Sequence, residues 1–339
     1  IESGGNYNTV VGDEAGTAIT TGDSNVALGK SSLAATTTGA NNTAVGVLAV
    51  LSNTTGNNNV GVGREALEAN TTASNNTAVG YQSLTANTTG TGNSALGTSS
   101  LPACTTGDYN VAIGYQSQRL TTTADNNTGL GAYTLYDNTT GASNVAVGFS
   151  ALANNTTASS NVAFGQDALL INTTGSYNTA LGYEALRLAT TAANNTAVGR
   201  QALTANTTGT QNTAVGATAL DANTTANYCT AVGYGSLSAN TTGTENSAVG
   251  RSSLLANTTG GKNVAFGSGT LAGNTTASDN TGLGWAALFN TTTGANNTAV
   301  GSSALVANTT GANNSAAGYS ALGANTTGSS NAAFGLYAL

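Results

Sequence analysis

Histidine and methionine are absent from this 339-residue chain, and proline occurs once. Without histidine, the side chain that most often serves as a general base or metal ligand near neutral pH is missing. Only 6% of the residues are charged, and seven Lys or Arg against fourteen Asp or Glu give a net charge of −7. This balance argues against binding to nucleic acid or to an acidic lipid surface. No apolar run approaches the ~18 residues that a membrane-spanning helix needs.

What the sequence does contain is a fixed period. From Asn8 onward it divides into twenty units of 17 residues without insertion or deletion, and the last unit stops at its ninth residue, Leu339. We number positions 1 to 17 on the unit Asn76–Gly92, NTAVGYQSLTANTTGTG. An unbroken period is the signature of a repeat architecture, and it overrides the two-domain expectation that this length would give.

We therefore predict one continuous repeat region over residues 1–339. Because the chain begins in mid-unit and without Met, we expect it to be a segment of a longer polypeptide.

Positions 1 and 5 each hold one residue type almost throughout. Position 5 is Gly in all twenty units, which predicts a positive φ or a close backbone approach. Position 1 is Asn in nineteen units, and stacked Asn amides can hydrogen-bond from coil to coil. The predicted structural ladder includes Asn76, Gly80, Asn195, Gly199, Asn212 and Gly216.

The period also predicts the fold class. A helix–turn–helix repeat needs roughly 33 residues or more, so 17 residues are too few. Apolar and β-branched residues come in runs of three to four between Gly and Asn, which predicts strands at positions 2–4 and 8–10 and a third extended piece or turn at 12–14. We predict an all-β protein, a parallel β-solenoid of twenty 17-residue coils.

Strand parity predicts which side chains face inward. Thr77 and Val79 share one face of the first strand, while Ala78 and Gly80 share the other. We expect the Thr77 and Val79 face to line the coil interior opposite Leu84. The smooth Ala/Gly face would then lie outside, where a second sheet or a neighbouring chain could pack.

The two cysteines, Cys104 and Cys229, stand at position 12 and position 1. They are seven to eight coils apart, roughly 35–40 Å at ~4.8 Å per coil. A disulfide needs Cα atoms within about 7 Å, so an internal bridge is excluded. We interpret both as small replacements for Asn, with an inter-chain disulfide as the alternative.

The block N-T-A-V-G-x-x-A/S-L, as in Asn195–Leu203 and Asn212–Leu220, resembles the head repeats of trimeric autotransporter adhesins. The resemblance covers all twenty units but only about half of each, because the family repeat is shorter and lacks the segment Asn87–Gly90. It implies a left-handed parallel β-roll that assembles as a homotrimer and projects from a bacterial surface.

The Asn-Thr-Thr segment matches the N-glycosylation acceptor pattern Asn-x-Ser/Thr. It predicts attached sugar at Asn53, Asn70, Asn87, Asn138, Asn155, Asn172, Asn206, Asn223, Asn240, Asn257, Asn274, Asn308 and Asn325, and one place earlier in its unit at Asn290. The unit junctions add the triplets at Asn41, Asn75, Asn126, Asn194, Asn296 and Asn313.

A structural interpretation of the same segment stays open. Six units lack the position-12 Asn but keep the following Thr pair, so this pair has a role of its own, as β-branched residues with stacked hydroxyls. Asn is also a common turn residue. O-linked sugar on the Thr columns is a further alternative.

Function follows from these patterns. The fourteen acids are scattered over variable outer positions, and no Asp-rich calcium repeat occurs, so we predict no enzyme and no catalytic, cofactor or metal site. The leading hypothesis is an extracellular structural fibre or adhesin shaft, coated with sugar and self-associating as a homotrimer or end-to-end filament.

Two alternatives remain. Aligned Thr columns could bind ice, although Thr88 and Thr89 are adjacent and in a strand would point to opposite faces. The outer Tyr residues, such as Tyr81 and Tyr115, could instead make the chain a carbohydrate-binding adhesin.

Overall fold

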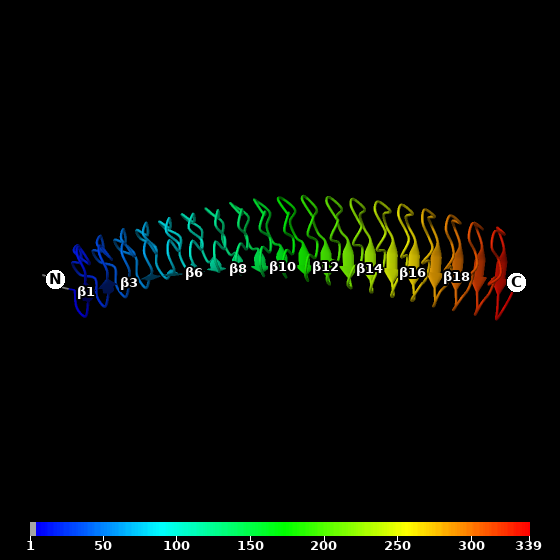
Figure 1. Cartoon of the computed structure of the whole chain (residues 1–339), viewed down its shortest axis with the longest axis horizontal. Helices are drawn as coiled ribbons and strands as arrows, with labels where there is room; N and C mark the ends of the chain where they lie inside the picture. The colour runs from blue at the N-terminus through cyan, green and yellow to red at the C-terminus, as the bar shows by residue number, and fades with distance from the viewer. Residues whose placement is uncertain (1–4) are drawn as a thin grey trace. The chain divides into compact units, whose positions relative to one another are not determined.

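The structure, a computed structural model, describes residues 5–339, and the chain divides into two compact units, Ile1–Thr174 and Gly175–Leu339. Each unit consists of 17-residue coils with one three-residue strand apiece, and no helix occurs among the described residues. Within each unit the strands pair in parallel with their neighbours (Figure 1). Each unit is a parallel β-solenoid, as the period predicts. Continuity from one unit to the next stays a prediction of the sequence.

The strands occur once every 17 residues. In the first unit they are β1 (Thr9–Val11), β2 (Val26–Leu28), β3 (Thr43–Val45), β4 (Val60–Val62), β5 (Thr77–Val79), β6 (Ser94–Leu96), β7 (Val111–Ile113), β8 (Thr128–Leu130), β9 (Val145–Val147) and β10 (Val162–Phe164). In the second they are β11 (Thr179–Leu181), β12 (Thr196–Val198), β13 (Thr213–Val215), β14 (Thr230–Val232), β15 (Ser247–Val249), β16 (Val264–Phe266), β17 (Thr281–Leu283), β18 (Thr298–Val300), β19 (Ser315–Ala317) and β20 (Ala332–Phe334).

The register stacks equal positions on one another. In β5 and β6, for example, Ala78 lies opposite Ala95 and Val79 opposite Leu96. Outside the strands the coils are also hydrogen-bonded, as where the Leu84 amide donates to the Ser100 carbonyl at 2.9 Å. Backbone groups all around the coil therefore find partners in the neighbouring coils, which stacked parallel segments require.

The coil contains one strand, so the prediction of a second strand at positions 8–10 is wrong, whereas positions 12–14, predicted as an extended piece or a turn, form a bend. Positions 6–11 form successive turns. The reason is the backbone at positions 7 and 9, where Gln82 and Leu84 both have φ of +52°. Two left-handed residues separated by one other residue turn the chain sharply, whereas a strand needs φ near −120° at each residue.

The predicted strand parity is also wrong. Ala78 and Leu84 are fully buried, while Thr77 is exposed and Val79 is half-buried. The coil interior is too narrow for a Val-sized side chain opposite Leu. The short distance between positions 3 and 9 is clear at Gly61, another position-3 residue, where an added Cβ would lie 2.5 Å from Cγ2 of Val50 at position 9. Only Ala or Gly fits there in most coils, and the larger residues of the strand point outward.

An outward apolar column results from this parity. We use this name for the position-4 side chains of β1–β10 and, separately, of β11–β20. Phe266 is 55% exposed and Leu283 45% exposed. Positions 2 and 4 hold no charged residue in any coil. Exposed members include Leu28, Leu96, Ile113 and Phe164 in the first unit, and Leu181, Val215 and Val300 in the second.

Exceptions inside the coil compensate one another in size. Val10 takes the place of Ala at position 3, and the position-9 residue of the same coil is Gly16 in place of Leu. A Cβ on Gly16 would lie 3.1 Å from the Val10 side chain. Gly282 stands at position 3, and the space that a Cβ would fill is taken by Cγ2 of Thr270 from the preceding coil. The interior volume is thus held nearly constant, as close packing demands.

The position-5 glycines have both properties that the sequence predicts. Gly80, Gly199 and Gly216 have φ of 137°, 135° and 136°, a region that side-chain-bearing residues rarely adopt. Their backbone also approaches the next coil closely. A Cβ on Gly80 would lie 2.5 Å from the carbonyl oxygen of Gly97.

We predict that Gly199→Ala destabilises its coil by about 2–4 kcal/mol, because the new Cβ is strained by φ and would lie 2.6 Å from the Gly216 carbonyl. Gly235→Ala is the matched control. Gly235 has φ of +62°, its Cβ would meet only Leu255 Cδ1 at 3.7 Å, and other coils hold Gln or Ser there. Thermal unfolding and amide exchange measure the difference. Equal loss in both variants would contradict the explanation.

A second prediction concerns the coupled core pair. Gly61→Ala alone should destabilise the first unit because its methyl meets Val50 Cγ2. Adding Val50→Leu removes that branch and restores the residue most coils have, so the double variant should recover stability. We expect a coupling of about 1–3 kcal/mol in a double-mutant cycle followed by urea unfolding. Additive effects would show that the two positions do not share one space.

Candidate functional site

The position-1 asparagines form a buried amide ladder between coils. The Asn76 Nδ2 donates to the Gly90 carbonyl at 2.9 Å, and its Oδ1 accepts the backbone amide of Asn93 at 2.9 Å. Asn195 repeats the arrangement, donating to Gly209 and accepting from Asn212, each at 2.9 Å. Each side chain thereby satisfies backbone groups at the corner directly before the strand begins.

The position-12 asparagines form a second ladder, also inside the coil. The Asn70 Nδ2 donates to the Asn53 Oδ1 at 2.9 Å and to the Ala73 carbonyl at 3.1 Å. A sugar on this nitrogen would replace one of its two protons and need space that the interior lacks. The fully buried side chains are those of Asn53, Asn70, Asn87, Asn138, Asn155, Asn172, Asn206, Asn223, Asn240, Asn257, Asn274 and Asn308.

Other acceptor triplets lie at the surface. Asn290 is exposed, because it stands one place before position 12, and Asn325 in the last complete coil is half-buried. The six junction residues are exposed too, at position 17, with φ between 57° and 63°. These are Asn41, Asn75, Asn126, Asn194, Asn296 and Asn313. Attachment of sugar stays a prediction, and Asn290 and the six junction residues have exposed side chains for it, whereas the twelve position-12 side chains inside the coil are buried.

The two Thr columns differ in their surroundings. At position 13 the hydroxyl donates to the carbonyl of the next coil, as from Thr88 to Thr105 at 3.0 Å. At position 14 the residue is exposed, as at Thr89. The position-14 column is thus the more exposed of the two, while the position-13 column is half-buried and its hydroxyls bond to the next coil. Ice binding through the position-14 column stays an untested alternative.

Both cysteines replace an Asn inside the coil. The Cys104 Sγ donates to the Gly107 carbonyl at 3.5 Å, and the Cys229 Sγ to the Gly243 carbonyl at 3.2 Å. These are the position-15 carbonyls to which the Asn amides donate elsewhere. Burial raises the pKa of each thiol to about 11. The thiols are thus small polar substitutes for Asn, and neither lies at the surface where an inter-chain disulfide would form.

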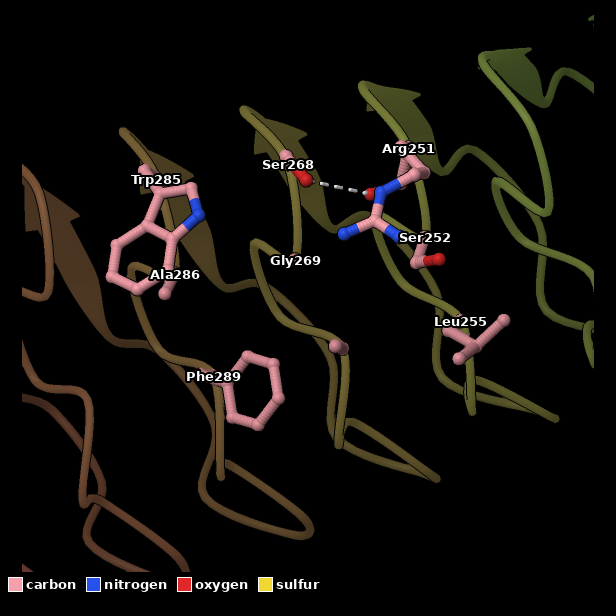
Figure 2. A pocket seen from close by; sticks show the side chains of 9 residues that line it. Arg251, Ser252, Leu255, Ser268, Gly269, Trp285, Ala286 and Phe289 are labelled. Atoms are coloured by element: carbon pink, nitrogen blue, oxygen red, sulfur yellow. Dashed lines mark hydrogen bonds between the residues drawn. The ribbon is translucent and has the colours of Figure 1, made fainter.

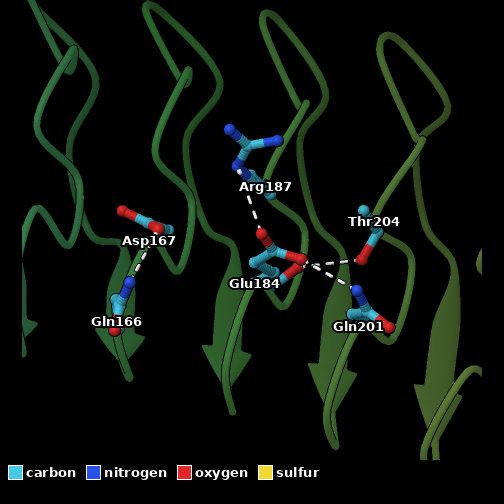
Figure 3. A network of polar contacts seen from close by, with 6 residues as sticks. All are labelled: Gln166, Asp167, Glu184, Arg187, Gln201 and Thr204. Carbon is cyan, nitrogen blue, oxygen red and sulfur yellow. Dashed lines mark hydrogen bonds and ion pairs between the residues drawn. The ribbon is translucent and has the colours of Figure 1, made fainter.

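The acids of the outer surface lie in small polar networks. In the second unit the Glu184 carboxylate accepts from Gln201 Nε2 at 2.9 Å, and Arg187 lies 3.9 Å from it (Figure 3). In the first unit a hydrogen bond from Gln82, with further help from Arg64, lowers the pKa of Glu65. These contacts stabilise charges at the surface. Among residues 5–339, no group of three or more His, Cys, Asp or Glu could hold a metal ion.

Several outer aromatic rings pack on one another. In the first unit Tyr133 has Tyr115 at 5.5 Å and Phe149 at 5.7 Å between ring centroids, both edge to face. The Arg119 guanidinium lies 5.2 Å from the centre of the Tyr136 ring. Such rings stabilise the neighbouring coils.

The second unit contains a different arrangement, a hollow of about 300 Å³ over three successive coils (Figure 2). Positions 6 and 10 hold Arg251 and Leu255 in the first of these coils, and Trp285 and Phe289 in the third. The middle coil has only small residues at positions 6, 7 and 10: Ser268, Gly269 and Ala272. The sequence shows Trp285 and Phe289 at variable outer positions, but it does not single out the hollow between them.

Comparison with known proteins adds no relative to this geometry. No protein-family model matches the chain, and no curated protein matches it. The resemblance to adhesin head repeats therefore rests on the repeat block alone. In the part of the chain that the structure describes, no helix is long and apolar enough to cross a membrane.

We predict that both thiols are slow to react with a soluble disulfide reagent at pH 8, at least about 100-fold slower than in denaturant, because they are buried and their pKa is about 11. The folded protein keeps each thiol protonated at pH values above the ordinary pKa of 9.0. The free energy of unfolding should therefore be constant below about pH 9 and fall between about pH 9 and pH 11. Single Cys→Ser variants assign each thiol. Rapid labelling of native protein would contradict the burial.

Proposed function

We propose that the chain is the shaft of an extracellular fibre or adhesin, with a structural and not a catalytic role. The observation that carries this proposal is the repetition of one hydrogen-bonded coil with an apolar column along its outside. Each coil presents the same donors and acceptors to the next, so the structure can be lengthened by adding units. The repeat block that resembles autotransporter head repeats supports the extracellular setting.

Self-association is the second part of the proposal, and the outward apolar column is its surface. Ten strands at ~4.8 Å spacing and ~10 Å length give an outer strip of roughly 480 Å² per unit, in which the position-4 side chains form the apolar part and the Thr, Ser, Val or Ala residues of position 2 the remainder. We propose that a second copy of the chain covers it. A copy has the same column at the same spacing, so side chains of the two columns can interdigitate throughout. The proposed state is a homotrimer, with an end-to-end filament as the alternative.

Charge supports pairing in the second unit. Residues 175–339 hold four acidic and four basic residues, whereas the entire net charge of −7 falls on residues 1–174. Two copies of the neutral segment repel each other little, and the column itself contains no charge.

The test places charges on the column. We expect the triple variant Val215→Glu, Phe266→Glu and Leu283→Glu to remain a single chain in sedimentation and to lose filaments in electron micrographs. The matched control puts the same charges into the same coils at exposed position 14, as Thr225→Glu, Thr276→Glu and Thr293→Glu, and should assemble like the parent chain. Circular dichroism checks that all fold. A parent chain that stays compact and monomeric would refute the proposal.

A further inference from the structure

We propose that the hollow between Arg251, Trp285 and Phe289 binds an acidic saccharide, a pyranose ring that carries a carboxylate. This site is distinct from the self-associating column, because its walls come from positions 6, 7 and 10 and not from the strands. It also differs from a general surface of outer Tyr residues, since it is confined to three coils.

The width of the hollow suits one ring. Equal positions two coils apart are separated by ~9.6 Å along the solenoid. A single ring halfway between leaves ~4.8 Å on either side, within the range at which rings pack face to face or offset. The middle coil leaves this space open because Gly269 and Ala272 have almost no side chain and Ser268 a short one. In Figure 2 the rings of Trp285 and Phe289 stand on one side and Arg251 on the other.

The walls combine apolar faces with polar groups. Trp285 is 63% exposed and Phe289 41%, so both rings keep surface available to a ligand. Aromatic faces pack against the C–H face of a pyranose. The hydroxyls of Ser252 and Ser268 line the same hollow, and the Ser268 hydroxyl makes only a long 3.4 Å bond to the Arg251 carbonyl. Hydroxyl partners of this kind suit a ligand with several hydroxyl groups.

The charge at the hollow selects an anion. Arg251 is exposed and forms no ion pair within residues 5–339. A guanidinium binds a carboxylate through two parallel hydrogen bonds. The second unit is neutral overall, so it does not oppose the approach of an anion as residues 1–174 would. A uronic acid satisfies the ring, the hydroxyls and the guanidinium together.

Trp285 is the only tryptophan of the chain, so tryptophan fluorescence reports on this hollow directly. We expect glucuronate to change the fluorescence of the full chain saturably, and glucose to bind at least about 10-fold more weakly. Arg251→Gln should abolish that difference between the two sugars. Calorimetry with Phe289→Ala should show at least a several-fold loss of glucuronate affinity.

Filling the hollow provides the sharpest comparison. Ala272→Leu places at position 10 a residue that other coils already hold there, so it should fold and should weaken glucuronate binding at least about 10-fold. Ala34→Leu is the matched control, the same change at position 10 of the first unit, and should bind like the parent chain. Equal binding by Ala272→Leu, or equal affinity for glucose and glucuronate, would overturn the proposal. Tighter binding of benzoate than of glucuronate would assign the hollow to flat aromatic acids instead.

Discussion

The narrowness of the coil interior is the constraint on which the rest of the structure depends. The space between the strand and the opposite wall accepts one Leu, two small residues at positions 3 and 8, and two Asn side chains in a typical coil. This leaves no room for a second layer of apolar side chains. Cohesion must therefore come from bonds between coils, and it does so through backbone pairs and the two amide ladders. Asn is the residue that suits this role, because its amide both donates and accepts.

Close stacking also explains the glycine at position 5. Coils in register bring equal positions together, and at this corner the backbone of one coil lies against the carbonyl of the next. The φ near 135° and the close approach to the next coil's carbonyl occur at the same residue, so only glycine satisfies both. Leu84 and its equivalents have φ near 50°, which costs on the order of 1 kcal/mol each and is tolerated because the buried side chain fills the coil.

The period and the solenoid could be predicted from the sequence, because both depend on the repeat itself. The glycine corner and the position-1 ladder could be predicted too, because one residue type recurs at that position in nearly all twenty units. The strand parity could not be predicted in this way. A three-residue strand offers a single alternation, and the larger side chain of Val79 suggested the interior although Ala78 occupies it. The turns at positions 7 and 9 could not be predicted either, because Gln and Leu rarely adopt a positive φ.

The site was harder still. The Asn-Thr-Thr triplet looks the same whether its amide lies inside a turn or outside, and the structure alone distinguishes buried Asn87 from exposed Asn290. The hollow depends on a difference between neighbouring coils, since small residues at Ser268, Gly269 and Ala272 stand between bulky ones. Comparing positions 6, 7 and 10 between neighbouring coils would have shown this difference in size. Comparing each position over the whole chain shows only that the position is variable.

The size compensation between neighbouring coils has a consequence for how such an array can change its number of repeats. A duplication or deletion of 17 residues preserves the period, so copy number can vary without breaking the ladders. Yet Gly61 depends on Val50, and Gly282 on Thr270, each across a unit junction. A crossover between those partners would join an Ala to a branched neighbour or leave a void. Recombination at these two junctions is thus disfavoured, while most other junctions join interchangeable coils.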